Sequence, residues 1–89
     1  MNHQKAIDFV TPFLGALAIA QQHNKPFMVM ETNTASCGGL PGFSDSFGAA
    51  LYLIDAAMQM AAFNFSGALI HVGGQNTFYN VSYFNSACF

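Results

Sequence analysis

The stretch that decides the fold is Phe27-Met28-Val29-Met30, a run of four apolar residues between Pro26 and Glu31. A short continuous apolar run with such flanks is typical of a strand that is buried on both faces, as in a parallel sheet. A second run of this kind, Ala68-Leu69-Ile70-His71-Val72, is followed by Gly73-Gly74. The sequence therefore predicts two buried parallel strands.

The residues between these two runs are expected to form a loop and then a helix. Thr32 to Phe43 has no hydrophobic period and contains glycine and proline turn signals. Ser44 and Asp45 are two candidate N-caps for a helix that extends to about Phe63. Asp55 is the only charge in that helix, so most of its circumference is expected to meet protein. One side of it repeats apolar residues at helical spacing: Phe47, Leu51, Ile54, Met58 and Ala61 or Ala62.

Another helix is predicted before the first strand, beginning at Pro12, which suits a first helical turn. Its apolar and polar residues repeat at helical spacing up to Gln21, and a polar stop precedes Pro26. The same segment also has the outline of a secretory signal, because Lys5 precedes an apolar run and Ala18-Ile19-Ala20 matches a cleavage pattern. Both interpretations stay open on these residues.

The predicted order is helix, strand, loop, helix, strand, which favours a parallel βαβ arrangement. Two strands and two helices can neither close a barrel nor cover an open sheet, so both strands would present unpaired edges. The composition points the same way, because 53% of residues are hydrophobic and 7% are charged, against about 25% charged in ordinary domains. We therefore expect part of a larger α/β core, and an isolated chain that aggregates.

Several classes of partner and cofactor are excluded or disfavoured. Two basic side chains cannot neutralise a run of phosphates, which excludes a nucleic-acid partner. No apolar stretch reaches the length of about 18 residues that a membrane span needs. Cys37 and Cys88 are too few for a disulfide scaffold; they either pair in an oxidising compartment or are buried free thiols. No metal site and no cofactor are expected, because the spacing of His, Cys and Gly matches neither.

Glu31 is the candidate catalytic residue, since it is the only glutamate and directly follows the first apolar run. Ligands and catalytic groups collect at the carboxyl ends of parallel strands. The alternative is a glutamate that binds the loop or pairs with a lysine. His71 could point into the same site from the second strand, or it could be a satisfied core histidine. Asn33 and Asn76, on the following loops, could bind sugar hydroxyls or the loop backbone.

The residues around Glu31 resemble a known family. METNTASCGGLPGFSDSFGAAL, from Met30 to Leu51, followed by His71-Val72-Gly73-Gly74-Gln75-Asn76, closely resembles fungal members of glycoside hydrolase family 79, the β-glucuronidase and heparanase-like enzymes. The likeness runs from about Pro12 to Asn80 and covers only the C-terminal part of the catalytic barrel of that family.

The resemblance implies a fold, namely part of a (β/α)8 TIM barrel in the α/β class. Residues 1–80 would be the C-terminal portion of the barrel, and residues 81–89 an atypical tail. The helix before the first strand would be helix 6 of the barrel. Phe27–Met30 would be strand 7, Asp45 to about Phe63 helix 7, and Ala68–Val72 strand 8.

The resemblance also implies a reaction. Glu31 would be the nucleophile of a retaining glycosidase that acts on β-glucuronides, and its acid/base partner would lie on the fourth strand, which this sequence lacks. Retention needs two carboxyl groups about 5–5.5 Å apart. Asn33, His71, Asn76 and Tyr79 are the predicted substrate contacts. The parent protein would be secreted and would bind a carbohydrate without any cofactor.

We therefore expect this chain alone to be inactive. Two alternatives remain. One is a non-catalytic pseudoenzyme piece that keeps the barrel sequence without its chemistry. The other is a short secreted peptide whose N-terminal signal is cleaved after Ala20.

Overall fold

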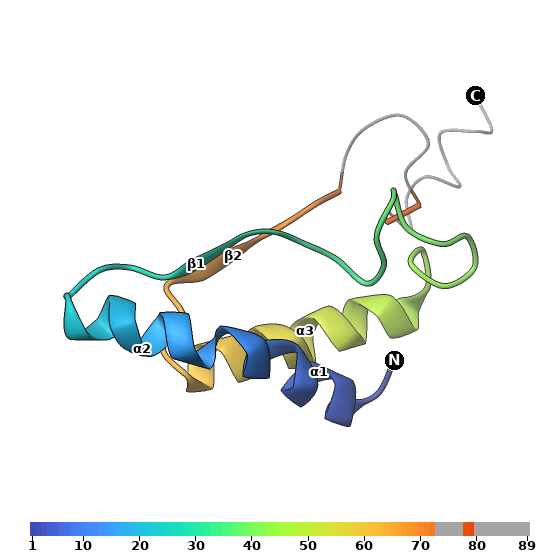
Figure 1. The fold of residues 1–89 in the computed structure, drawn as a ribbon. Coiled ribbons are helices and arrows are strands. Elements are labelled where there is room, and N and C mark those ends of the chain that lie inside the picture. The colour runs from blue at the N-terminus through green and yellow to red at the C-terminus, as the bar shows by residue number, and fades with distance from the viewer. Residues whose placement is uncertain (73–77, 80–89) are drawn as a thin grey trace.

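The computed structural model describes residues 1–72 and 78–79. Helices form one layer and strands the other (Figure 1). The elements, in chain order, are α1 (His3–Val10), the 3-10 helix η1 (Thr11–Phe13), α2 (Leu14–Gln22), β1 (Met28–Thr32), α3 (Phe47–Ala62) and β2 (Gly67–Ile70). None of the described helices has the length and apolar character that crossing a membrane requires.

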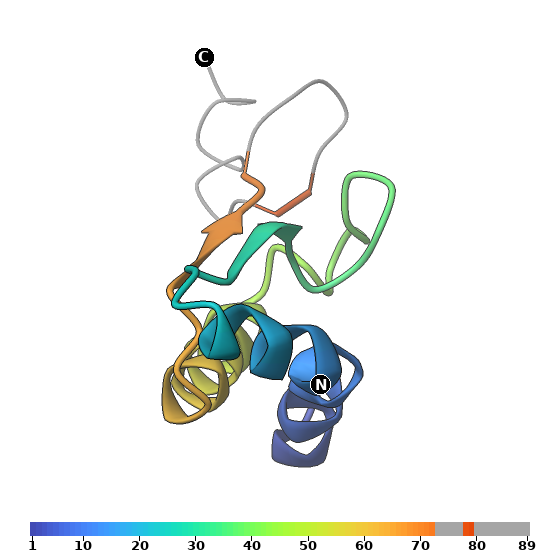
Figure 2. The same cartoon turned by 60° about the vertical axis from the view of Figure 1, so that its left-hand side comes forward.

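The two strands are parallel neighbours, and α3 connects them. This confirms the predicted βαβ order and the small α/β unit. The helices form two arms: α1 with α2 is the first, and α3 is the second. Figure 2 shows the two helical arms beside each other, on the same side of the strands. The described residues supply two strands of a sheet, which is consistent with a piece of a barrel.

The first helical arm begins earlier than the sequence predicted. Asn2 is the N-cap of α1, and its side-chain oxygen accepts a hydrogen bond from the backbone N–H of Lys5 at 3.0 Å. Ala6 and Val10, one turn apart, are the buried residues of α1. Pro12 lies in the short 3-10 turn between α1 and α2. The predicted start at Pro12 is therefore wrong, because a capped and partly buried helix already precedes it.

The N-cap of α3 is Ser46 rather than Ser44 or Asp45. Its hydroxyl oxygen accepts a hydrogen bond from the N–H of Ala49 at 3.2 Å, and its hydroxyl donates to the carbonyl of Phe43 at 2.7 Å. The two predicted caps are wrong because Ser44 is buried inside the preceding loop, which delays the first helical turn.

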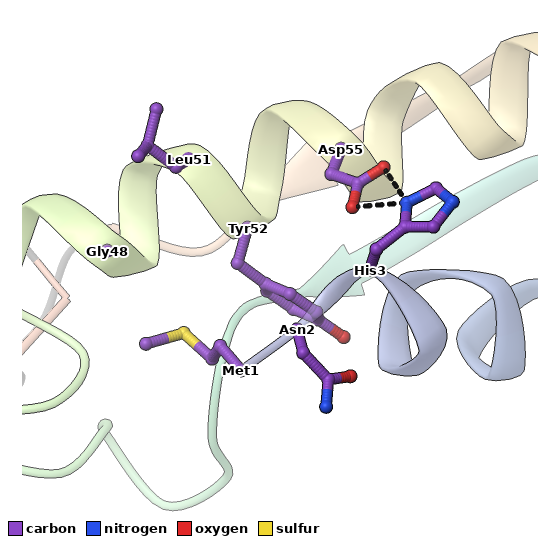
Figure 3. A pocket seen from close by; sticks show the side chains of 7 residues that line it. All are labelled: Met1, Asn2, His3, Gly48, Leu51, Tyr52 and Asp55. Carbon is purple, nitrogen blue, oxygen red and sulfur yellow. Dashed lines mark hydrogen bonds and ion pairs between the residues drawn. The ribbon is translucent and has the colours of Figure 1, made fainter.

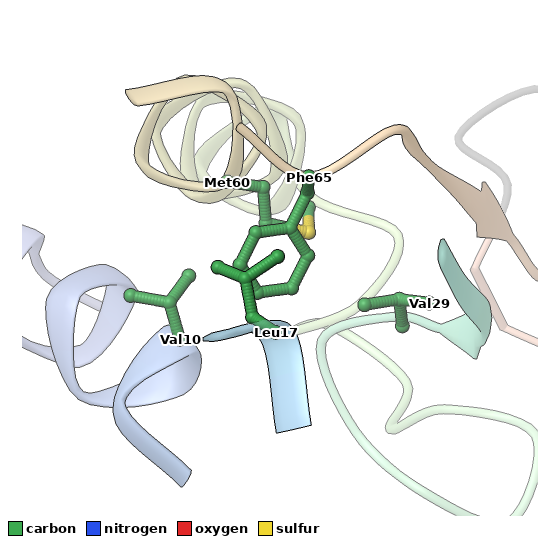
Figure 4. Packing of buried hydrophobic residues seen from close by; sticks show 5 residues of the cluster. All are labelled: Val10, Leu17, Val29, Met60 and Phe65. Carbon is green, nitrogen blue, oxygen red and sulfur yellow. The ribbon is translucent and has the colours of Figure 1, made fainter. Parts of the chain in front are cut away.

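The core joins all the main elements of the chain. Phe65 stands edge to face against Phe27 and Phe13, with ring centroids 5.2 and 6.4 Å away, an arrangement that aromatic rings favour. The buried members come from both helical arms, β1 and the turn before β2: Val10, Leu17, Val29, Met60 and Phe65 (Figure 4). The burial of Val10 and Leu17 supports the helical interpretation of the N-terminal segment.

The apolar side of α3 that the sequence singled out faces solvent in this chain. Phe47 is 74% exposed and Met58 is 67% exposed, whereas Ala49, Ala56 and Met60 are the buried residues of this helix. The radius of gyration is 14.7 Å, against about 12 Å for a compact domain of this length. The unit therefore leaves a large apolar surface open, and patches of that kind mark sites of contact with other protein.

We predict that the isolated chain self-associates through this face of α3. The apparent mass of the chain in sedimentation velocity should exceed the 9.5 kDa of the monomer. Met58→Lys should shift the population towards monomer, since it places a charge in the apolar face. Gln22→Lys adds the same charge at an exposed polar position and should leave the distribution unchanged. Monomeric wild-type chain at micromolar concentration would contradict the prediction.

Candidate functional site

The carboxyl ends of β1 and β2 border an open cavity of about 660 Å³. Phe9 and Tyr52 of the helix layer also border it. The ends of parallel strands are where α/β folds bind ligands. Its polar lining gathers side chains from both strand ends and from the part of the chain that follows β2: Glu31, Thr32, Asn33, Thr34, His71 and Tyr79.

A bulge in β1 sets the direction of Glu31. The strands pair Val29 with Ala68 and Thr32 with Ile70, so Met30 and Glu31 together oppose the single residue Leu69. One extra residue in a strand is the mark of a β-bulge, which skips one step of the alternation between sheet faces.

The two pairs that flank the bulge face the helices. Val29 is in the core and Ala68 packs against it, while Ile70 borders a hollow together with Met60 and Phe65. Because one alternation is skipped between these pairs, Met30 and Glu31 share the opposite face of the sheet. Their exposure agrees, since Met30 is 68% exposed and the Glu31 side chain 76% exposed.

His71 lies beside Glu31 across the strand ends. It follows β2 directly, and its Nδ1 is 3.8 Å from Oε1 of Glu31. The His71 side chain is 41% exposed, so neither group is taken out of water. Within the described lining of the cavity, Glu31 supplies the carboxylate.

Asn33 ties the two strand ends together. Its side-chain amide donates to the carbonyl of His71, and its side-chain oxygen accepts from the N–H of Thr34 at 2.7 Å. The N–H of His71 donates to the carbonyl of Thr32 at 3.0 Å, which extends the pairing of the strands beyond β2. Asn33 thus holds the backbone of His71 in register with β1.

The loop between β1 and α3 is organised around Ser44. This residue is 2% exposed, and its hydroxyl oxygen accepts hydrogen bonds from the N–H of Leu40 at 3.0 Å and from the hydroxyl of Thr34 at 2.9 Å. This role is not visible in the sequence, because a serine before a helix is typical of an N-cap. The only signal for it was its place at the end of a loop rich in glycine.

Tyr79 closes the cavity on the side of the loop. Its hydroxyl donates to the carbonyl of Ala35, and its ring meets the ring of His71 edge to face with centroids 5.6 Å apart. The predicted substrate contacts Asn33, His71 and Tyr79 therefore lie together with Glu31 around one cavity. Asn76, the remaining one, is outside the described residues.

A second hollow, of about 290 Å³, lies between α1 and α3 (Figure 3). His3 Nδ1 is 3.0 and 2.9 Å from the two carboxylate oxygens of Asp55 there. Burial, then Asp55 and Asp8, raise the pKa of Tyr52, which also borders the hollow. These contacts join the two helical arms, and Asp55 has a local partner.

The described cysteine and metal-ligand side chains do not build a metal site. Cys37 is exposed, so the expectation of a buried thiol is wrong for it, because it sits on the surface loop at a φ of 58°. Cys88 is outside the described residues. In the described part of the chain, no group of three or more His, Cys, Asp or Glu side chains converges.

A parallel βαβ unit with polar side chains gathered at its strand ends is the construction of α/β proteins that bind ligands at that edge. The chain is similar to the β-glucuronidase of Aspergillus niger, at 34% identity over 77 residues, which take in 82% of this chain and 14% of the relative. The chain thus corresponds to a small part of that enzyme. No family model matches the chain, and no solved structure matches it.

We predict that Ser44→Ala loosens the loop of the site. The substitution leaves the N–H of Leu40 and the hydroxyl of Thr34 without their buried partner, which costs about 1–3 kcal/mol. Amide hydrogen exchange at Leu40 should accelerate about tenfold or more. Ser36→Ala, at an exposed position of the same loop, should change it little. Equal exchange rates in the two variants would show that the Ser44 contacts do not hold the loop.

Proposed function

We propose that this chain is part of a retaining glycoside hydrolase of family 79 that acts on β-glucuronides, with Glu31 as the nucleophile. The observation that carries the proposal is the place of this carboxylate, at the end of a parallel strand and on a bulge that turns it to the face of the sheet away from the helices. The partial match to a fungal β-glucuronidase supports it independently.

The proposed parent fold is a (β/α)8 barrel, of which residues 1–80 form the C-terminal portion. In that barrel α1 to α2 would be helix 6, β1 strand 7, α3 helix 7 and β2 strand 8. The exposed apolar side chains support this placement. Met30 on the sheet would face the barrel interior, and Phe47 and Met58 on α3 would meet neighbouring protein.

The reaction needs Glu31 in its ionised form. The carboxylate attacks the anomeric carbon and forms a glycosyl ester, while a second carboxylic acid protonates the oxygen of the leaving group. The second group then acts as a base, activating the water that breaks the ester.

The substrate contacts are proposed to surround the same cavity. Tyr79 and His71 present ring edges and polar atoms to it, and Asn33 borders it. Because the Asn33 amide and the Tyr79 hydroxyl already donate to backbone carbonyls, Asn33 would bind a sugar hydroxyl through its remaining capacity, and Tyr79 would meet the sugar with the edge of its ring. Asn76 completes the proposed set, outside the described residues.

The nucleophile is tested in a hybrid enzyme. The segment of the Aspergillus niger β-glucuronidase that aligns with this chain is replaced by the matching residues of this chain, and hydrolysis of an aryl β-glucuronide is measured. Glu31→Gln should lower kcat by about a thousandfold or more, because an amide cannot form the glycosyl ester. Asp45→Asn makes the same change of carboxylate to amide beside α3, outside the lining of the cavity, and should retain activity.

Rescue by azide distinguishes a nucleophile from a residue that is essential for another reason. In the hybrid carrying Glu31→Ala, azide can occupy the space of the lost carboxylate and attack the anomeric carbon in its place. Recovery of turnover with an α-glucuronosyl azide as product is the expected result. A β-azide would identify Glu31 as the acid/base residue instead, and a hybrid whose rate is unaffected by either substitution would sink the assignment.

We predict no turnover of an aryl β-glucuronide by the 89-residue chain alone. Its described cavity carries one carboxylate, and the general acid that the leaving group needs has no counterpart there. The same assay as for the hybrid, run at equal molar concentration, checks this. Hydrolysis at the rate of the intact relative would contradict the fragment interpretation, whereas an inactive hybrid would favour the pseudoenzyme alternative.

A further inference from the structure

We infer that Tyr79 is a positioning residue, whose ring rests on Gly39 and fixes the imidazole of His71 beside the carboxylate of Glu31. The consequence for catalysis rests on the proposed function, but the arrangement itself does not. In this arrangement Tyr79 acts on His71, and His71 acts on Glu31. The family resemblance suggested instead that both side chains contact the sugar directly.

Gly39 provides the place for the Tyr79 ring. A Cβ atom at position 39 would come within 2.9 Å of both Cδ1 and Cε1 of Tyr79 and within 3.0 Å of Cβ of Ser44. Ser44 is itself fixed by its buried hydrogen bonds, so it cannot move aside without cost. The ring therefore sits in space that exists only because residue 39 has no side chain.

Two hydrogen bonds attach this part of the chain to the loop after β1. The hydroxyl of Tyr79 donates to the carbonyl of Ala35, and the N–H of Phe78 donates to the carbonyl of Gly38. Together with the contact at Gly39, they hold Tyr79 at its hydroxyl, along one edge of its ring and at the backbone just before it. Its position is thus set by the loop rather than by a ligand.

The fixed ring of Tyr79 limits the rotation of the His71 side chain. The backbone of His71 is already fixed, because its N–H donates to Thr32 and its carbonyl accepts from Asn33. Rotation of the imidazole is the freedom that remains, and the edge-to-face contact with Tyr79, at 5.6 Å and 89°, occupies one side of it. The contact leaves Nδ1 turned towards Glu31, at 3.8 Å.

An imidazole held there stands beside the attacking group. Its Nδ1 is 3.8 Å from Oε1 of Glu31, beyond hydrogen-bond distance, and a ring N–H brought into contact with the carboxylate would be a charge-assisted donor. The imidazole also covers one side of the Glu31 side chain, which is otherwise 76% exposed. The contacts therefore run from Gly39 through Tyr79 and His71 to the proposed nucleophile.

Two glycines offer a matched pair of substitutions. Gly39 and Gly42 both have positive φ, at 89° and 74°, but nothing lies within 4 Å of a Cβ built at Gly42. Gly39→Ala and Gly42→Ala share the backbone strain, and only Gly39→Ala displaces Tyr79. In the hybrid enzyme, Gly39→Ala should lower kcat about tenfold to a hundredfold beyond the effect of Gly42→Ala, with KM nearly unchanged. Equal kcat values in the two variants would overturn the inference.

Substitutions of Tyr79 separate positioning from direct binding. Tyr79→Leu removes the contact with His71 and should lower kcat as Gly39→Ala does, whereas Tyr79→Phe keeps that ring contact and should lower kcat much less than Tyr79→Leu. His71→Gln should lower kcat to a similar extent. A large rise in KM for Tyr79→Phe would identify the hydroxyl as a substrate contact and would contradict the positioning role.

A measurement on the full 89-residue chain needs no activity. Diethyl pyrocarbonate modifies imidazoles at rates that follow their exposure, and His3 and His23 serve as internal references in peptide mass spectra. Tyr79→Leu and Gly39→Ala should raise the rate at His71 several-fold relative to His23, and Gly42→Ala should not. Unchanged rates would overturn the inference. If His71 is modified at the expected rates but the hybrid enzyme is inactive, the proposed function is overturned, whereas the contact of Tyr79 with His71 is supported.

Discussion

The extra residue that β1 carries opposite Leu69 is the constraint on which the site depends. Without it, strict alternation would put Glu31 on the same face as Val29, against the helices. With it, the carboxylate shares a face with Met30 and comes within reach of His71. The strand is held on both sides of the bulge, by the packing of Val29 in the core before it and by the pairing of Thr32 with Ile70 after it.

The parts of the fold that follow from hydrophobic patterning were predictable from the sequence. Two short apolar runs around a helical segment led to parallel strands joined by α3. The burial on both faces that these runs predicted is wrong for the described chain, because no other layer covers the second face: Val29 is the buried residue of β1, and no residue of β2 is buried. Boundaries set by single hydrogen bonds were not predictable. Ser44, Asp45 and Ser46 are all good caps by residue type, and only the burial of Ser44 in the loop decides that Ser46 takes the role.

The site was predictable in its residues but not in its contacts. The position of Glu31 after an apolar run, and of His71 in the next run, follows from the rule that strand ends share an edge. The bulge leaves no trace in the pattern, because four apolar residues in a row carry no alternation to interrupt. The contact of Tyr79 with Gly39 joins residues 40 positions apart, and no local periodicity reports a contact at that distance along the chain.

The exposed apolar surfaces and the single carboxylate in the described cavity both indicate that this unit packs against further protein in its parent. A helix that exposes Phe47 and Met58 loses the burial that would stabilise it, worth about 1.5–3 kcal/mol for each large apolar side chain. A sheet of two strands also leaves backbone groups unpaired at both edges. Neighbouring strands and helices would satisfy both needs at once. In the proposed barrel, the same neighbours would also bring a second carboxyl group to the strand ends, so one addition to this unit would supply both the missing burial and the proposed chemistry.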